Sequence, residues 1–214
     1  MFYYRRGSAG SRLSPEDVEE EAFKDARILH FTGITPALSQ SAREACLKAL
    51  RLAEKNGVLV SIDTNIRPVL WASLEEAARV LMPMIEKANF LFTDPTDSEI
   101  LVGESEPEKI LEVFRGLGIE TVVVKLGERG AVASSGSEKA RAEAVQVSVE
   151  DPIGAGDGLA GTFLACQMAG RNLFDSLRRA TLVGSLVTTI RGDQEMIPTL
   201  KDLEAVYRYY YPYP

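Results

Sequence analysis

A regular alternation of helix and strand patterns from Ser39 onward constrains the fold of this chain more than any other sequence feature. Amphipathic segments with capping-box spacing predict helices at about 41–56 and 73–87, and short apolar runs predict strands at 58–62, 89–93 and 121–126. Strands separated by helices generally pair in parallel, because the helix returns the chain to the same end of the sheet. The sequence therefore predicts an α/β fold, a mostly parallel sheet with helices on both faces.

Further elements continue this pattern towards the C-terminus. Helices are expected after Pro95, over 108–117, and from Gly156, Leu173 and Thr199, while 131–134 and 142–147 are expected to form an antiparallel strand pair. Ligands of open parallel sheets bind outside the carboxyl ends of the strands. Polar or glycine-rich segments at 63–67, 94–97, 127–130 and 154–157 follow such ends, so a ligand site is expected there.

Charge and composition exclude several classes of function. The 214-residue chain has a net charge of −7, which argues against a general nucleic-acid-binding protein. Its two cysteines lie far apart in predicted helices, and its single histidine, His30, lies in a predicted strand. No apolar run approaches the length of a membrane span, and no secretory signal pattern occurs. We expect a cytoplasmic protein without membrane contact.

The segment Asp151-Pro-Ile-Gly-Ala-Gly-Asp157 carries the strongest chemical signal. Gly154 and Gly156 allow a sharp turn beside Ala155, and the free N–H groups of the following helix start would bind an anion. Asp157 is placed to accept a proton from a substrate hydroxyl beside a bound phosphate. The alternative interpretation is a structural turn that caps the helix.

This spacing resembles the C-terminal signature of the ribokinase-like (PfkB-type) carbohydrate kinases. The segment Thr121–Gly130, a strand that ends in a Gly-x-x-Gly turn, resembles the nucleotide loop of the same family. The resemblance implies a ribokinase-like fold and ATP as phosphate donor. It also implies nucleotide contacts from Lys125, Gly127 and Gly130, together with Gly154 and Gly156.

The segment Ser61–Trp71 resembles the Asp-x-Asn-x-Arg-x-x-Leu-Trp stretch of those family members that phosphorylate 2-keto-3-deoxygluconate and related sugar acids. Asp63, Asn65 and Arg67 alternate, so in extended backbone their side chains would point the same way. The amide of Asn65 is assigned to the nucleotide. Arg67 could pair with the γ-phosphate or a substrate oxygen and neutralise developing charge.

Asp94 and Asp97 stand where the family has an Asn-x-x-Glu motif, which helps to organise magnesium and phosphate. The resemblance assigns Asp94 to cofactor binding and Asp97 to Mg²⁺, since hard oxygen ligands suit that ion. Stabilisation of a helix N-terminus is the alternative role of Asp97.

The N-terminal segment Phe2–Ser11 resembles a substrate strand of the same kinases, and the stretch Ile190–Glu195 resembles another part of their sugar site. In a strand Tyr3 and Arg5 would share one face and could hold the hydroxyls and carboxylate of a sugar acid. Choosing this pair over its neighbours rests on the resemblance, as does a substrate contact for Asp193.

The resemblance extends over nearly the whole chain but begins partway into the longer family sequence, so we expect a partial domain truncated at the N-terminus. Residues 1–12 would be a remnant of the substrate and lid strands, 26–206 the nucleotide- and phosphate-binding core, and 207–214 a tail. The predicted function is phosphorylation of a primary hydroxyl of a sugar acid by ATP with Mg²⁺. Alternatives are another ribokinase-like sugar or nucleoside kinase, or a non-catalytic nucleotide-binding fragment; homo-oligomerisation is left open.

Overall fold

The computed structural model describes residues 5, 7–192 and 194–212. The chain forms two compact units, Met1–Val122 and Val123–Pro214, and the boundary falls inside strand β4. The strands follow the order β1-β2-β3-β4-β5-β6 in the sheet. β1 pairs with β2 and β2 with β3 in parallel, whereas β5 and β6 are antiparallel. The predicted α/β class with a mostly parallel sheet is confirmed.

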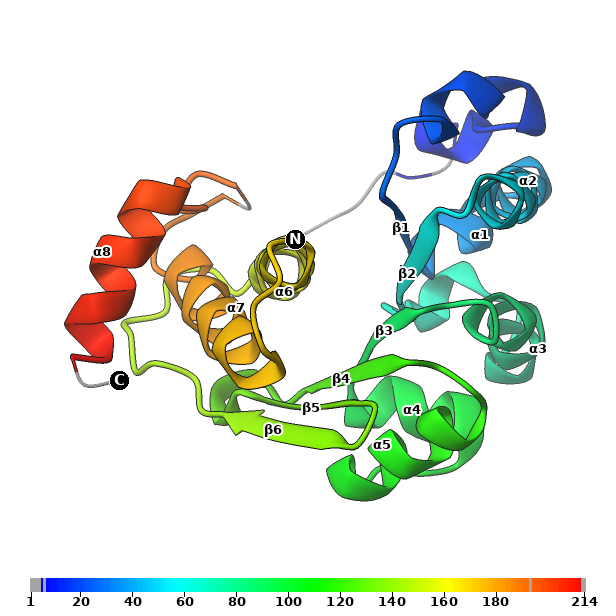
Figure 1. Ribbon diagram of the computed structural model, residues 1–214. Helices are drawn as coiled ribbons and strands as arrows, with labels where there is room; N and C mark the ends of the chain where they lie inside the picture. The colour runs from blue at the N-terminus through cyan, green and yellow to red at the C-terminus, as the bar shows by residue number, and fades with distance from the viewer. Residues whose placement is uncertain (1–4, 6, 193, 213–214) are drawn as a thin grey trace. The chain divides into compact units, whose positions relative to one another are not determined.

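From α2 onward, the strands and helices of the first unit follow the order that the sequence predicts, whereas helix α1 and the 3-10 helices were not predicted (Figure 1). Its elements are β1 (Ile28–Thr32), α1 (Ile34–Leu38), α2 (Gln40–Asn56), β2 (Leu59–Asp63), α3 (Leu74–Ile85), β3 (Phe90–Thr93), α4 (Pro95–Val102), α5 (Pro107–Gly116) and the start of β4 (Thr121–Lys125), with 3-10 helices at Gly10–Arg12, Pro15–Asp17, Glu20–Phe23 and Pro68–Leu70.

Helix α2 shows how the sequence pattern produces this structure. Its predicted apolar stripe is buried, at Ala42, Ala45, Cys46, Ala49, Leu52 and Ala53. The predicted end at about 56 is confirmed, because Gly57 has the left-handed φ of 66° typical of a helix C-cap. The sequence predicts a start at about 41, whereas the structure places the N-cap at Ser39. The hydroxyl of Ser39 accepts the Ala42 amide at 3.0 Å, so the helix begins one residue earlier, at Gln40.

The second unit contains the rest of β4, a 3-10 helix at Gly127–Arg129, β5 (Ala131–Ser135), β6 (Glu138–Ala142), α6 (Ala155–Met168), α7 (Leu173–Val187) and α8 (Leu200–Tyr210). Helices α6 and α7 lie side by side, and α8 packs on α7 (Figure 1). Leu182, Val183, Val187 and Leu203 form a buried cluster between these last two helices.

The return strand of the hairpin differs from the prediction. The sequence indicates 142–147, but β6 is Glu138–Ala142, and Ala131 pairs with Ala142. Gly136 adopts a φ of 55° in a tight turn, so the chain reverses directly after β5. The strand was missed because three of its five residues, Glu-Lys-Ala-Arg-Ala, are charged, most are exposed and they form no apolar run.

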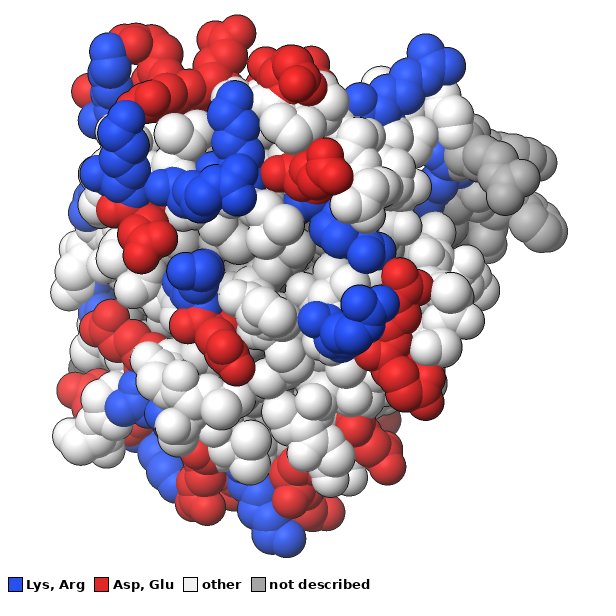
Figure 2. All heavy atoms as spheres, turned by 90° about the vertical axis from the view of Figure 1, so that its right-hand side faces the viewer, with Lys and Arg blue, Asp and Glu red and all other residues white. Residues whose placement is uncertain are grey.

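Charged side chains of both signs lie on the surface, and both cysteines are buried. Figure 2 shows basic and acidic side chains intermixed over the face that it displays. Cys46 and Cys166 are buried in α2 and α6, and burial raises the pKa of Cys46 to about 12. Within the described part of the chain, no helix has the length and apolar character that crossing a bilayer requires.

Candidate nucleotide and phosphate site

The turn before α6 has the predicted anion-binding geometry. Gly154 adopts a left-handed φ of 81°, which favours glycine, and its carbonyl accepts the Gly158 amide at 2.8 Å as the first bond of the helix. The amides of Ala155, Gly156 and Asp157 precede that bond, so they have no acceptor within the helix. Together with the helix dipole, they make this end of α6 suitable for a phosphate.

Contacts with α7 fix the position of this turn. The amides of Glu150 and Asp151 both donate to the carbonyl of Thr188, at 2.8 and 3.1 Å, and the Asp151 carboxylate accepts the Ile153 amide at 3.1 Å. The turn is therefore anchored to the C-terminal end of α7 before α6 begins.

Two glycines allow α6 and α7 to approach closely. A methyl group added to Gly158 would lie 3.0 Å from the Val187 side chain, and one added to Gly184 would lie 3.1 Å from the carbonyl oxygen of Ala155. Both distances are tighter than ordinary carbon contacts. The role of Gly184 was missed by the sequence analysis, because a single glycine inside a helix pattern carries no specific signal.

The Gly-x-x-Gly turn after β4 is also present as predicted. Gly127 and Gly130 have φ values of 60° and 83°, and the Gly130 carbonyl accepts the Leu126 amide at 2.8 Å. A Cβ atom on Gly130 would collide with the carbonyl oxygen of Ala142. Both glycines are thus required by backbone conformation, and the second is required by close approach as well.

A cavity of about 420 Å³ joins these two turns within the second unit. This volume lies within the range of sites for small molecules and cofactors. Of the predicted residues, Lys125, Gly127, Gly130, Ala155 and Gly156 line it. Other lining residues were not predicted from the sequence, among them Val145, Gln146, Val147 and Val149 from the segment after β6, and Thr181, Ser185 and Thr188 from α7 and its C-cap.

Lys125 places a positive charge, and Asp157 a carboxylate, next to the turn before α6. A methyl group added to Gly156 would lie 3.6 Å from the Lys125 ammonium nitrogen, so that cation lies beside the turn. Asp157 is exposed in the first turn of α6. The cavity thus combines apolar walls that suit a flat ring with a cation and helix N-terminal amides that suit an anion, and a carboxylate lies next to those amides.

In the first unit, the loop after β2 is not extended as the sequence predicts. Asn65 has a φ of 33°, so the backbone turns there instead of remaining extended. The expectation that Asp63, Asn65 and Arg67 point the same way because they alternate is therefore wrong. Asp63 is buried at 1% exposure, Asn65 is half-buried and Arg67 is exposed.

Asp94 and Asp97 begin helix α4, at the carboxyl end of β3. Asp94 is the N-cap, and its Oδ1 accepts the Asp97 amide at 2.9 Å. Asp97 is 5% exposed, and its Oδ2 accepts the hydroxyl of Thr64 at 2.6 Å and the amide of Ile66 at 3.0 Å. Nowhere among the described residues do three acidic, histidine or cysteine side chains gather as metal ligands. A magnesium role for Asp97, shared with bound phosphates, stays a prediction.

The predicted sugar site is described only in part. Tyr3 and Asp193 lie outside the described residues. Arg5 is half-buried, and its carbonyl accepts the Ser8 amide at 3.1 Å. The described part of this segment continues into a turn and the 3-10 helix Gly10–Arg12, not into the expected strand.

Comparison with known proteins assigns the chain to a family. The sequence pattern of the pfkB family of carbohydrate kinases matches residues 2–200. A 2-dehydro-3-deoxygluconokinase of Thermoproteus tenax is 40% identical over 205 residues, which cover 95% of this chain and 62% of that protein. The chain therefore belongs to the pfkB family of carbohydrate kinases.

Other relatives are similar in sequence and structure. A 2-dehydro-3-deoxygluconokinase of Bacillus subtilis is 31% identical, with 94% of this chain and 62% of that protein covered. A crystal structure of a putative ribokinase II from E. coli in complex with ATP and Mg²⁺ matches with a TM-score of 0.90 and 28% identity, over 97% of this chain and 67% of that one. The chain thus spans about 62% of the length of these two curated relatives.

Proposed function

We propose that this protein transfers the γ-phosphate of ATP to a primary hydroxyl of a sugar acid such as 2-keto-3-deoxygluconate. The observation that carries the proposal is the 420 Å³ cavity lined by the Gly127–Gly130 turn and by the start of α6. The names of the relatives from Thermoproteus tenax and Bacillus subtilis support the sugar-acid class, and the E. coli structure supports ATP with Mg²⁺.

Each residue of the site has a distinct proposed role. The apolar side chains of the 145–149 segment would contact the base, while Lys125 and the amides of Ala155 and Gly156 would bind phosphate oxygens. Magnesium bound with the triphosphate would neutralise part of its charge. Asn65 and Arg67 would act on the phosphates, and Arg5 with Tyr3 and Asp193 on the sugar acid.

Asp157 is the proposed general base. Its carboxylate would accept the proton of the substrate hydroxyl as the hydroxyl oxygen bonds to the γ-phosphorus. The bond from that phosphorus to the bridging oxygen would break, and ADP would leave with the electron pair. The amides at the start of α6 and the Arg67 guanidinium would stabilise the charge that develops on the transferred group.

The test compares wild-type protein with Asp157→Asn and Asp202→Asn. Asp202 is a matched control, because it is also an exposed carboxylate at the third position of a helix, in α8. We expect Asp157→Asn to lower the rate of phosphate transfer from radiolabelled ATP by about 10²- to 10⁴-fold, the usual contribution of a general base. Asp202→Asn should keep the wild-type rate.

Two results would contradict the proposal. An Asp157→Asn variant that retains the rate within a few fold would remove the assignment of the base. Thermal stabilisation of the wild-type chain by ATP, without transfer to any sugar acid, would instead indicate a nucleotide-binding module without catalysis.

A further inference from the structure

The loop Thr64-Asn65-Ile66, directly after β2, has a backbone conformation that must be imposed by its surroundings. Asn65, with a φ of 33°, is the one non-glycine residue with positive φ in the described part of the chain. Asparagine tolerates this region better than most residues, but the conformation remains unfavourable for an L-amino acid. Such a residue persists only where neighbouring contacts determine the backbone, which is a common condition at functional sites.

Hydrogen bonds of its backbone amides hold the start of the loop. The Thr64 amide donates to the carbonyl of Phe92 in β3 at 2.9 Å, and the Asn65 amide donates to the Asp63 carboxylate at 3.2 Å. On the side of β1, the Gly33 amide donates to the Asp63 carbonyl at 2.8 Å. A Cβ atom on Gly33 would collide with the carbonyl oxygen of Thr64, so this turn packs directly on the loop.

Asp97 contacts the loop on both sides of Asn65. One oxygen of its carboxylate, Oδ2, accepts the Thr64 hydroxyl at 2.6 Å and the Ile66 amide at 3.0 Å. Thr64 is fully buried, and Asp97 and Ile66 are each 5% exposed. Hydrogen bonds to a buried carboxylate are strong, because the charge has lost most of its hydration and only such donors compensate for that loss.

We propose that Asp97 is a positioning residue: its buried carboxylate holds Thr64 and Ile66 and thereby fixes the left-handed turn at Asn65. The loop then presents the half-buried Asn65 and the exposed Arg67 beyond it in one conformation. The consequence for phosphate transfer rests on the function proposed above, whereas the effect on the loop does not. This role differs from that of a magnesium ligand and from that of a carboxylate that only stabilises the start of α4.

The first measurement is hydrogen exchange of the Ile66 amide by NMR in the whole chain. The variants are Asp97→Asn, Thr64→Val and the double variant. Thr96→Val and Glu99→Gln are matched controls, because they make the same chemical changes at exposed positions of α4. Each single loop variant should speed exchange by about 10- to 100-fold, the factor for loss of a hydrogen bond to a charged group.

The double variant tests whether the two groups act together. Because the Thr64 hydroxyl acts through the Asp97 carboxylate, the double variant should exchange no more than about twofold faster than Asp97→Asn alone. Both controls should exchange at the wild-type rate. The proposal would be overturned if Thr64→Val left the exchange rate of the Ile66 amide unchanged. It would also be overturned if the double variant sped exchange by the product of the two single-variant factors.

The second measurement separates positioning from metal binding. In the phosphate-transfer assay, Thr64→Val and Asp97→Asn should lower kcat to a similar extent, while the Mg²⁺ concentration for half-maximal rate stays within about twofold of wild type. A higher Mg²⁺ requirement in Asp97→Asn, with Thr64→Val normal, would make Asp97 a magnesium ligand and overturn the proposal. If wild-type protein transfers no phosphate, the proposed function fails, and the exchange data still decide the role of Asp97 in the loop.

Discussion

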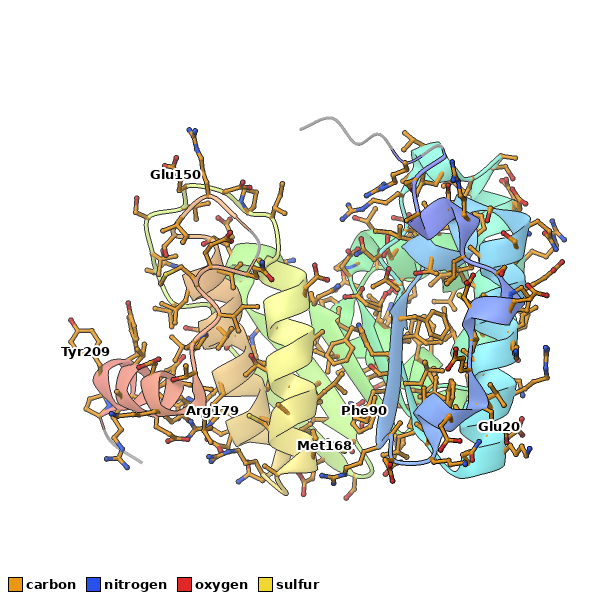
Figure 3. The ribbon with its side chains drawn as sticks, turned by 90° about the horizontal axis from the view of Figure 1, so that it is seen from above. Glu20, Phe90, Glu150, Met168, Arg179 and Tyr209 are labelled. Atoms are coloured by element: carbon orange, nitrogen blue, oxygen red, sulfur yellow. The ribbon has the colours of Figure 1, made fainter. Side chains whose placement is uncertain are left out.

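Replacing Asp175 by asparagine should destabilise the second unit through loss of a partly buried charge network. Asp175 in α7 accepts hydrogen bonds from Arg171 at 2.9 Å and from Arg179 at 3.1 Å. Both arginines also donate to Glu204 of α8 at 2.8 Å. Arg179 is labelled in Figure 3, and its side chain is only 6% exposed, so its charge depends on these partners.

The size of the effect follows from exposure. Removing one partner of a fully buried ion pair costs about 3–5 kcal/mol. The Asp175 side chain is 22% exposed and Arg179 keeps its bond to Glu204, so we expect a loss of about 2 kcal/mol, less than the fully buried case. Glu150→Gln is the control, because Glu150 accepts Arg191 at 3.0 Å with the side chains 52% and 86% exposed. That pair should contribute less than about 0.5 kcal/mol.

The assay is urea unfolding followed by far-UV circular dichroism at neutral and acidic pH. Burial alone would raise the pKa of Asp175, but hydrogen bonds from Arg179 and Arg171 hold it below its ordinary value of 3.8. A carboxylate with a lowered pKa stabilises the folded state above its unfolded pKa and loses that contribution as the pH falls through the folded pKa. The difference between wild type and Asp175→Asn should therefore be full at pH 7 and shrink below pH 3.8.

The controls decide the interpretation of this experiment. Trp71, the single tryptophan, belongs to the first unit, so its fluorescence follows that unit separately. A loss in Asp175→Asn no larger than that in Glu150→Gln would refute the reasoning. A difference from wild type that does not shrink as the pH falls below 3.8 would also refute it, because the contribution of the carboxylate is lost as Asp175 becomes protonated.

Two further predictions concern the cavity and the cysteines. Gly130→Ala should abolish thermal stabilisation by ATP, because the methyl group would collide with Ala142. The control Gly103→Ala, with a similar φ of 70° and no neighbour within 4 Å, should keep this stabilisation. Equal stabilisation by ATP in the two variants would contradict the assigned site. Cys46 and Cys166 should react with a thiol reagent at pH 8 only as fast as the protein unfolds, since a pKa of about 12 leaves roughly one Cys46 thiol in ten thousand ionised. Rapid labelling of folded protein would disprove their burial.

Local sequence patterns determined most of the fold and part of the candidate site. The apolar stripe of α2, the N-cap of α3 at Ser73 and the glycines at 127, 130 and 154 follow from periodicity, capping and backbone freedom, which act over a few residues. The antiparallel strand Glu138–Ala142 could not be found in this way. It is set by a tight turn and by pairing with β5, while three of its own five residues are charged.

The arrangement of side chains around each turn depended on contacts between distant segments. Helix α7 lines the cavity only because α6 and α7 approach closely at Gly158 and Gly184. No local sequence pattern near Gly184 indicates this close approach. Asp97 was recognised as a candidate from its motif, but its bonds to Thr64 and Ile66 join residues more than thirty positions apart. The sequence by itself determined which residue types follow each strand, because those patterns are local. The tertiary structure alone decided that Asn65 turns and that Asp97 contacts both sides of it, because a left-handed backbone is stabilised by partners that only folding brings together.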